Sequence, residues 1–323
     1  MSARILVTGG SGFIGAALVQ TLVRAGHSVR VLDDNSRGHP RRLAAVANDI
    51  EFIAGDIRDA AAVHAAAHGM DEVHHLAFIN GTEFFYTQPE LVLDVGVRGM
   101  LNVLDACRSQ NIGTFILASS SEVYHTPPNI PTDESAPLVV PDVQNPRYSY
   151  SAGKLISEVM AVNFGRKYFE RVLIFRPHNV YGPDMGFEHV IPQFALRLQD
   201  AAKQQPDGRL RFAIQGSGRE IRSFCFIDDV VAGVMTMRER GEHLGLYHVG
   251  TTEEVTIADL ARRIAAHAGR EIEVVPGALQ PGGPPRRCPD ISKLGRLGYK
   301  PRVLLNEGLK PTLDWYWSQA PSR

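Results

Sequence analysis

In the first half of the chain, short runs of almost only apolar residues alternate with segments in which apolar residues recur at helical spacing. The apolar runs predict strands over residues 5–8, 29–32, 50–53, 72–77 and 114–118. The helical pattern covers residues 16–23, an alanine-rich segment after Asp59, residues 89–108 and residues 148–168. Strands that are apolar on both faces are typical of a parallel sheet between two layers of helices. The pattern therefore predicts an α/β fold with a doubly wound parallel sheet.

The second half of the chain has a less regular pattern. Its predicted elements are a helix within 188–198, a polar loop at 203–208, helices over 228–240 and 256–267, and a proline-rich loop from Pro276 to Pro285. That loop is long enough to cover a substrate. We expect residues 1–180 to form the first domain and residues 181–323 a smaller C-terminal α/β lobe, with some segments of the second half returning to the first domain. The cleft between the two is the expected binding site.

The first strand ends in a glycine-rich turn at residues 8–15, TGGSGFIG, which opens into the first helix. Glycine permits turns with positive φ, a close approach to a pyrophosphate and close packing of helix on strand. The open N–H groups and positive dipole end of the helix favour an anion there. Eighteen residues after Gly15 the second apolar run ends in Asp33, where a carboxylate accepts ribose hydroxyls. The glycines alone could belong to an ordinary strand-to-helix turn. The strand before them, the helix after them and the acid at this distance together favour a Rossmann-type dinucleotide site.

The acid at the end of the second predicted strand also bears on which dinucleotide binds. The Asp33 carboxylate would repel an adenosine 2'-phosphate, so NAD is favoured over NADP, although Arg37 lies close enough in sequence to oppose this. Asp56 follows the third predicted strand and could accept the adenine amino group while Ile57 packs on the ring. The alternative is that Asp56 only shapes a turn and Asp59 caps the next helix.

A tyrosine and a lysine four residues apart mark the helix predicted over residues 148–168. Tyr150 and Lys154 lie on one helix face and can point into one cleft. Bringing a phenol from its ordinary pKa near 10 to near neutrality takes about 4 kcal/mol, which the ammonium and an oxidised nicotinamide ring could supply together. Ser120 follows an adjacent strand and could bond the same substrate hydroxyl. A Tyr-x-x-x-Lys pair by itself is most often an ordinary pair of residues on a surface helix. Here it follows the dinucleotide motif and the serine-rich strand end in the expected order, which favours a catalytic role.

Composition and charge narrow the classes of partner. Lysine and arginine (34) nearly balance aspartate and glutamate (35), so no overall field would attract nucleic acid or an anionic membrane. No apolar stretch approaches the ~20 residues that span a bilayer. The three cysteines are far apart and fit neither a disulfide framework nor a zinc site. The adjacent His74 and His75 point to opposite sides, which argues against a shared metal. We expect a cytosolic protein without a metal.

Six motifs in this order resemble the extended short-chain dehydrogenases/reductases that act on nucleotide-activated sugars, such as UDP-galactose 4-epimerase. They are TGGSGFIG (8–15), SSSEVY (119–124), YSAGK (150–154), RPHNVYGP (176–183), GSGREIRSF (216–224) and RCPDISK (287–293). The resemblance extends over nearly the whole chain. It implies bound NAD, a nucleotide diphosphate-sugar substrate held in part by arginine forks, and a homodimer formed through the helices near 90–108 and 148–168.

The resemblance and the spacing arguments together define a predicted site. The predicted catalytic residues are Ser120, Glu122, Tyr150 and Lys154. The predicted cofactor-binding residues are Gly9, Gly12, Phe13, Ile14, Gly15, Asp33, Asn35, Asp56, Ile57, Ala77, Tyr150, Lys154 and Pro177. The predicted substrate-binding residues are Ser120, Glu122, Asn179, Arg222 and Arg287.

Several positions depart from the family pattern and bear on the reaction. His125 stands where glycine is frequent, and His178 stands where an aromatic residue is common, as a possible acid, base or hydrogen-bond donor. Ser121 replaces the aspartate of the dehydratases, which weakens a 4,6-dehydratase interpretation, while Glu122 resembles the glutamate of the decarboxylases. The main hypothesis is an NAD-dependent 4-epimerase that acts through a transient 4-keto hexose. Alternatives are a decarboxylase, a dehydratase, a 4-ketosugar reductase or, remotely, a non-catalytic NAD-sensing protein.

Overall fold

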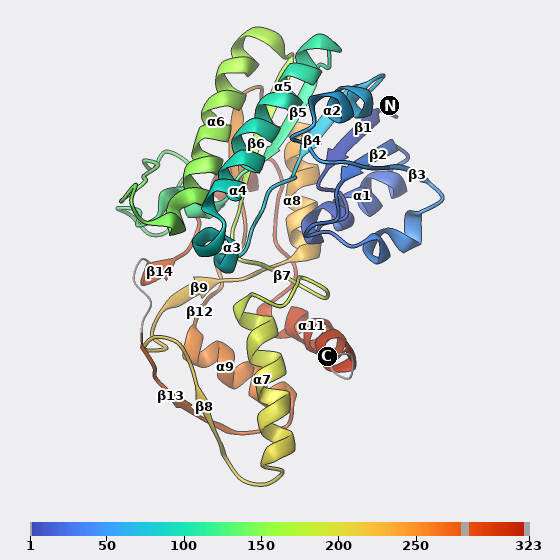
Figure 1. Ribbon diagram of the computed structural model, residues 1–323. Coiled ribbons are helices and arrows are strands. Elements are labelled where there is room, and N and C mark those ends of the chain that lie inside the picture. The colour runs from blue at the N-terminus through green and yellow to red at the C-terminus, as the bar shows by residue number, and fades with distance from the viewer. Residues whose placement is uncertain (1, 279–283, 320–323) are drawn as a thin grey trace.

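The computed structural model describes residues 2–278 and 284–319. Its centre is a parallel sheet of seven strands in the order β11-β6-β5-β4-β1-β2-β3 (Figure 1). The strands are β1 Arg4–Thr8, β2 Ser28–Asp33, β3 Ile50–Ala54, β4 Glu72–His75, β5 Thr114–Ala118, β6 Arg171–Pro177 and β11 Gly245–Val249. All neighbouring pairs run parallel. The predicted doubly wound parallel sheet is confirmed.

Helices cover both faces of this sheet, and the alternation of side chains explains the two cores. On β1, Ile5 and Val7 belong to one buried cluster, while Leu6 belongs to the other. The first cluster includes residues of α1 Phe13–Arg24 and α8 Ile227–Arg240 and continues into helices of the second half of the chain. The second includes residues of α2 Ala60–Ala67, α4 Pro89–Leu93, α5 Gly99–Ser109 and α6 Ser149–Tyr168. The helix predicted over 89–108 is found as α4, a π-helical segment at 94–98 and α5. The central strands are therefore apolar on both faces because both faces are covered, whereas the edge strand β3 has no buried residue.

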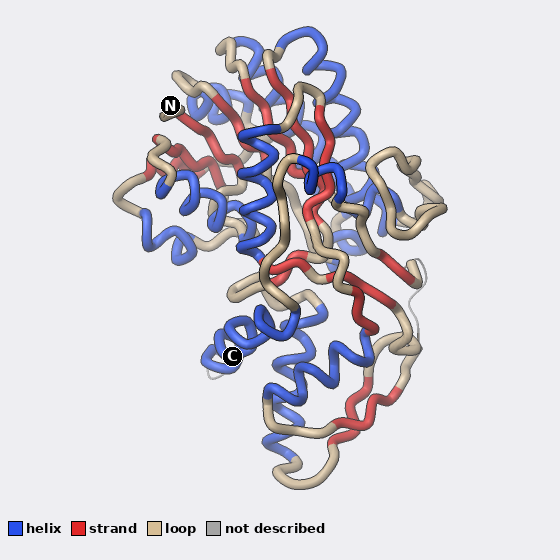
Figure 2. The backbone as a smooth tube through the Cα atoms, turned by 180° about the vertical axis from the view of Figure 1, so that it is seen from behind, coloured by secondary structure: helices blue, strands red, loops and turns tan. Residues whose placement is uncertain are grey.

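A smaller lobe lies below the sheet in both views (Figures 1 and 2). Its strands are β7 Val180–Tyr181, β8 Leu210–Ala213, β9 Ile221–Ser223, β10 Cys225–Phe226, β12 Glu254–Thr256, β13 Ile272–Val275 and β14 Arg286–Arg287. Its helices are α7 Val190–Gln204, α9 Ile257–His267 and α11 Leu305–Gln319, whereas α10 Ser292–Arg296 packs against β11 and α8 of the sheet domain. β11 pairs with β6 in the large sheet, although it comes from the second half of the chain. The boundary between residues 180 and 181 stays a prediction.

Three local predictions need correction. The loop after β2 contains a 3₁₀ helix, Pro40–Val46, that turn-forming residues did not reveal. α7 runs to Gln204 instead of ending at Leu198, because Ala201 and Ala202 still pack against the core. β4 ends at His75, two residues early. The middle of the proline-rich loop, 279–283, lies outside the described residues. No helix in the described ranges is long and apolar enough to cross a bilayer.

A buried cluster at the amino end of β4 predicts how stability depends on pH. Glu72 accepts hydrogen bonds from Arg238 at 2.8 and 2.9 Å and pairs with His74 at 2.5 Å. Although burial raises the pKa of Glu72, His74 and Arg238 outweigh it and hold the pKa at about 2. His75 bonds Thr8 instead, at 2.8 Å, and both histidines are packed as predicted.

We expect Glu72→Gln to lower the free energy of unfolding by about 3 kcal/mol at neutral pH. The folded carboxyl has the lower pKa, so its contribution is complete above the unfolded value of 4.5 and is lost as the pH falls toward about 2. Urea unfolding at several pH values measures this difference, which should vanish in strong acid. Asp71→Asn, which breaks the exposed Arg4 pair, is the control and should have little effect. A difference independent of pH would contradict the assignment.

Candidate active site

Three of the four glycines in the turn after β1 are each required there for a different structural reason. Gly9 has φ +74°, and a Cβ there would lie 2.5 Å from the backbone nitrogen of Ala77. A Cβ on Gly15 would lie 2.1 Å from the carbonyl oxygen of Gly9, so α1 can pack against the turn only through glycine. Gly12 is the N-cap of α1 and has no side chain to occupy the helix end. The N-terminus of α1 is therefore open to an anionic ligand.

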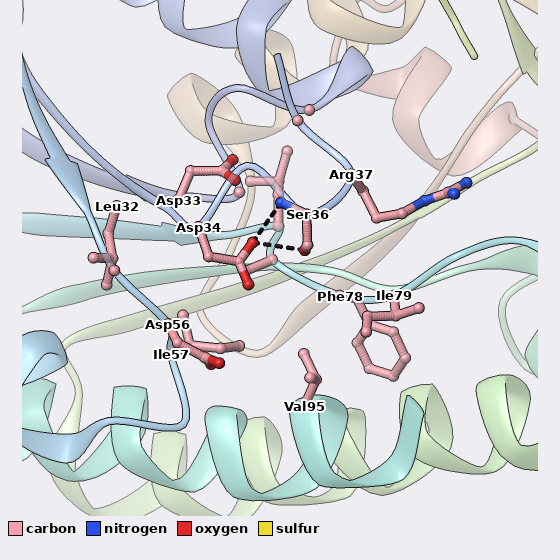
Figure 3. Close-up of a pocket in the computed structure, with 16 residues that line it drawn as sticks. Leu32, Asp33, Asp34, Ser36, Arg37, Asp56, Ile57, Phe78, Ile79 and Val95 are labelled. Carbon is pink, nitrogen blue, oxygen red and sulfur yellow. Dashed lines mark hydrogen bonds between the residues drawn. The ribbon is translucent and has the colours of Figure 1, made fainter. Parts of the chain in front are cut away.

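An open groove, with an empty volume of about 550 Å³ that includes solvent-open space, follows the carboxyl ends of β1 to β4 (Figure 3). Predicted cofactor residues in its wall are Gly9, Gly12, Asp33, Asp56, Ile57 and Ala77. The other wall residues are Leu32, Asp34, Ser36, Arg37, Gly38, Gly55, Leu76, Phe78, Ile79 and Val95. Most of these flank Asp33 or Ala77 in the chain, which is the signal that could have identified them.

The remaining predicted cofactor residues are not part of the groove wall. They are Phe13, Ile14, Gly15, Asn35, Tyr150, Lys154 and Pro177. Asn35 has a positive φ of 58°, and its side-chain oxygen accepts a hydrogen bond from Ser11 at 2.8 Å. Its side chain therefore braces the loop at the groove rim.

Asp33 is fixed at the end of β2 by two backbone hydrogen bonds. One carboxylate oxygen accepts from the N–H of Ser11 and the other from the N–H of Asn35, both at 2.9 Å. Each oxygen keeps a further lone pair for a ribose hydroxyl. Because Asp33 is a buried carboxylate in the groove wall, this site suits an adenosine ribose without a 2'-phosphate and therefore fits NAD.

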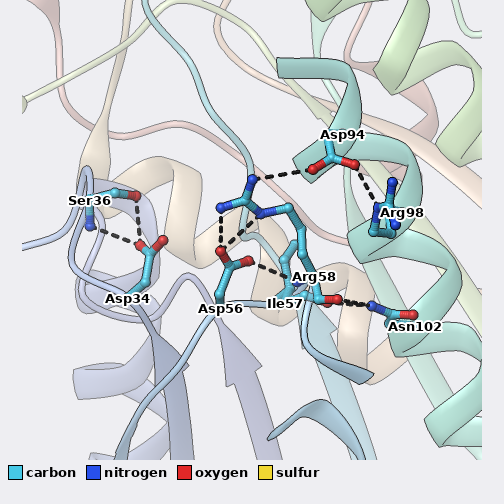
Figure 4. A network of polar contacts seen from close by, with 8 residues as sticks. All are labelled: Asp34, Ser36, Asp56, Ile57, Arg58, Asp94, Arg98 and Asn102. Carbon is cyan, nitrogen blue, oxygen red and sulfur yellow. Dashed lines mark hydrogen bonds and ion pairs between the residues drawn. The ribbon is translucent and has the colours of Figure 1, made fainter. Parts of the chain in front are cut away.

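Asp56 both lines the groove and shapes the turn after β3 (Figure 4). Its carboxylate accepts from the backbone N–H of Arg58 at 2.8 Å and pairs with that guanidinium at 2.5 Å, which lowers the pKa of Asp56. Arg58 also reaches Asp94 at 3.2 Å. Asp59 caps α2 by accepting from two backbone N–H groups, so the alternative interpretation of Asp59 is confirmed. The Asp56 carboxylate is therefore an ionised hydrogen-bond acceptor whose position is fixed by Arg58.

Tyr150 and Lys154 are buried together on one face of α6. The Lys154 ammonium donates to the carbonyl of Ala118 at 2.7 Å and lies 4.1 Å from the centre of the Phe78 ring. Burial lowers the pKa of Lys154 to about 7. Burial also raises the pKa of Tyr150 to about 12, against a hydrogen bond from Ser120 that lowers it. Ser120 favours the phenolate, whereas Lys154 does not contribute to lowering this pKa, so the expectation that the ammonium helps bring the phenol toward neutrality is not borne out.

The predicted substrate residues gather around an ion pair near Tyr150. Glu122, in a 3₁₀ turn at Ser121–Tyr124, pairs with Arg287 at 2.6 Å. Burial by itself would raise the pKa of Glu122. The pKa is nevertheless lower than its usual value, because the positive charges of Arg287, Arg147 and Arg222 stabilise the carboxylate. Burial and Arg287 lower the pKa of Arg222 to about 10. Three guanidiniums against one carboxylate leave an excess of positive charge, which suits an anionic substrate. Sequence reasoning missed Arg147, although it lies three residues before Tyr150.

The segment after β6 brings two more predicted residues to this edge. Asn179 has a positive φ of 36°, and its amide donates to the carbonyl of Ser223 at 2.9 Å. The ring of His178 is fully buried, and neither ring nitrogen has a hydrogen-bond partner among the described residues. Burial lowers the pKa of His178 well below its ordinary value, so the imidazole is neutral. It can donate one hydrogen bond and accept one.

Comparison with known proteins agrees with this geometry. A model of the "NAD dependent epimerase/dehydratase family" matches residues 5–250. dTDP-glucose 4,6-dehydratase from Streptomyces antibioticus is 32% identical, over 97% of this chain and 92% of its own. UDP-glucuronic acid decarboxylase 6 from Arabidopsis thaliana is 32% identical, over 95% of this chain and 86% of its own.

Among solved structures, the UDP-glucose 4-epimerase of Thermus thermophilus in complex with NAD aligns with a TM-score of 0.84. The identity is 28%, and the alignment covers 97% of this chain and 99% of that one. The expectation of an NAD-dependent fold related to sugar-nucleotide enzymes is thereby confirmed. Both the glycine turn and the fixed Asp33 carboxylate fit NAD, which is bound in the Thermus thermophilus epimerase structure. The chain belongs to the NAD dependent epimerase/dehydratase family, within the extended short-chain dehydrogenases/reductases.

Proposed function

We propose that this protein oxidises the C4 hydroxyl of a nucleotide-linked hexose transiently and returns the hydride in the same active site. The observation that carries the proposal is the placement of Tyr150 and Lys154 on one face of α6, with Ser120 close enough to the phenol to lower its pKa. NAD, when bound, supplies the hydride acceptor. Tyr150 takes the hydroxyl proton, Ser120 orients the substrate oxygen, and Lys154 supplies a cation and a donor near the nicotinamide ribose.

The anionic part of the substrate would bind where positive charge is in excess. Arg222 and Arg287 are paired across neighbouring strands β9 and β14, so both guanidiniums start from one small sheet. A diphosphate carries about two negative charges, which guanidinium forks bind well. Asn179 adds an amide next to the same sheet. The partner that these residues suit is a nucleotide diphosphate-sugar.

The fate of the 4-keto sugar decides the reaction. Epimerisation is our first candidate, because turning the ketone over and returning the hydride to its other face needs no acid or base beyond Tyr150. Decarboxylation is the second candidate, favoured by the Glu122–Arg287 pair beside Tyr150. Arg287 could orient a sugar carboxylate that leaves as carbon dioxide from the β-keto acid. Dehydration is disfavoured, because Ser121 offers no carboxyl group to protonate a leaving hydroxyl.

A panel of UDP- and dTDP-linked hexoses and hexuronates, analysed by mass spectrometry and sugar chromatography, tests these candidates. A product of unchanged mass and altered C4 configuration supports epimerisation. Loss of carbon dioxide from a hexuronate supports decarboxylation and overturns epimerisation, and loss of water overturns both. NAD binding without affinity for any sugar nucleotide would instead support a non-catalytic sensor. Thermal shifts with each nucleotide show which base the protein binds.

We also propose a homodimer formed through α4, α5 and α6, as the sequence predicts. These helices expose large apolar side chains at Leu93, Leu101, Ile156 and Val159. Val159→Glu should therefore convert a dimer to a monomer in light scattering, because it places charge in an apolar interface. Leu304→Glu is the control, because Leu304 is exposed in the other lobe. A wild-type monomer, or a dimer unaffected by Val159→Glu, contradicts this interface.

A further inference from the structure

The short helix α3, Thr82–Thr87, carries an aromatic ring that packs directly on Tyr150. The rings of Phe85 and Tyr150 are stacked, with their centroids 5.0 Å apart and an angle of 21° between planes. Phe78 meets the same ring edge-on, at 5.2 Å and 85°. A Cβ on Gly96 or Gly153 would lie within 3 Å of Phe78, so its ring fits into a notch between two helices. Two aromatic rings therefore restrict the orientation of the phenol.

The other side of α3 faces the second lobe. The guanidinium of Arg37 lies 4.9 Å from the centre of the Phe84 ring and forms two hydrogen bonds to Glu188, at 2.8 and 3.1 Å. Gly81, the N-cap residue just before α3, has φ +144°, and a Cβ there would lie 2.6 Å from a carboxylate oxygen of Glu188. The Arg37–Glu188 ion pair thus packs against Gly81 and Phe84. It joins the loop after β2, α3 and the segment before α7.

These contacts matter because α3 cannot hold its own place. A helix of one or two turns is unstable alone, so tertiary contacts must define its position. Phe84 and Phe85 are adjacent in the chain, and one contacts the ion pair while the other contacts Tyr150. Figure 1 shows α3 at the end of the sheet domain that faces the second lobe.

We propose that α3 positions the phenol of Tyr150 for the reaction and that the Arg37–Glu188 pair holds α3 in place. Phe85 is a positioning residue, since it acts through Tyr150. The placement of the reacting oxygen is coupled in this way to contact between the two lobes. This inference rests on the proposed function, in which Tyr150 moves the substrate proton.

The first test compares neighbouring substitutions on α3. Phe85→Leu removes the stacked ring and should lower kcat about tenfold or more with little change in KM, because a misplaced phenol slows the proton transfer. The acid limb of the pH profile should also move, since Tyr150 loses part of its apolar cover. Phe85→Tyr keeps the ring and should restore kcat. Tyr86→Leu is the matched control, because Tyr86 is exposed on the same helix.

The second test needs no substrate and also applies if Phe85→Leu fails to fold. Glu188→Gln should raise hydrogen exchange of the α3 amides about tenfold, because the charge on one partner is lost. Salt near 1 M should have a similar effect on the wild type, since the pair is partly exposed. Glu51→Gln, which breaks the exposed pair with Arg30, is the control.

The outcomes separate this inference from the proposed function. Unchanged exchange of α3 in Glu188→Gln overturns the role of the ion pair. A Phe85→Leu enzyme that behaves as Tyr86→Leu does, while Tyr150→Phe is inactive, overturns the positioning role alone. An active Tyr150→Phe enzyme overturns the proposed function, whatever the exchange measurement shows.

Discussion

Replacing Tyr150 with phenylalanine is expected to lower kcat by about 100-fold to 10,000-fold, the usual range for loss of a general acid–base group. The variant loses only the phenolic oxygen. Its ring keeps the contacts with Phe78 and Phe85, so the fold and the bound cofactor should be retained. Turnover of the best sugar nucleotide measures the loss, and the NAD released on denaturation measures occupancy.

Tyr148→Phe provides a matched control for this loss. Tyr148 lies two residues earlier, is buried, and bonds His125 at 2.9 Å. Its hydroxyl has no proposed role in proton transfer, so turnover should change little. Near-normal rates in Tyr150→Phe would refute the proposed mechanism, and equal losses in both variants would point to a structural effect instead.

Lys154→Met should reduce activity strongly and at the same time stabilise the fold. Burial lowers the pKa of Lys154 from 10.5 to about 7, so the folded protein binds this proton less tightly than the unfolded chain does. The corresponding cost is at most about 5 kcal/mol, and methionine of similar length avoids it. Activity should fall by about 100-fold or more, because the cation and donor proposed to act near the nicotinamide ribose are lost.

The sign of the pH dependence distinguishes this effect from simple repacking. The cost of the buried ammonium is complete below the folded pKa of about 7, decreases as the pH rises, and disappears above the unfolded value of 10.5. The stability gained by Lys154→Met should therefore be largest near pH 6 and shrink toward about pH 10 in denaturant titrations. A gain that is constant with pH, or a loss at every pH, would contradict a buried charged lysine.

The fold was largely predictable because its signals are local. Apolar runs bounded by glycine and acid positions located the strands, and helical spacing located α5 and α6. The turn at Gly9 and the carboxylate of Asp33 were identified for the same reason, since their roles follow from backbone geometry within one β-α-β unit. Predictions failed where tertiary contacts extend an element, as at the end of α7.

Other parts of the site could not be predicted, because they join residues far apart in the chain. Arg37 and Glu188 are separated by 151 positions, and Glu122 and Arg287 by 165. No local pattern marks α3, which is too short for helical periodicity. The pKa values of Tyr150 and Lys154 likewise depend on burial, which only the packed structure defines.

The sequence by itself determined the parallel sheet and the dinucleotide motif, and it pointed to the residues proposed for proton transfer, because each depends on neighbours within a few turns of chain. Only the tertiary structure decided which charges are paired, which titrating groups are buried and what holds the phenol in place. Electrostatic energy and packing depend on distance in space, and the chain brings these partners together only when both lobes have folded.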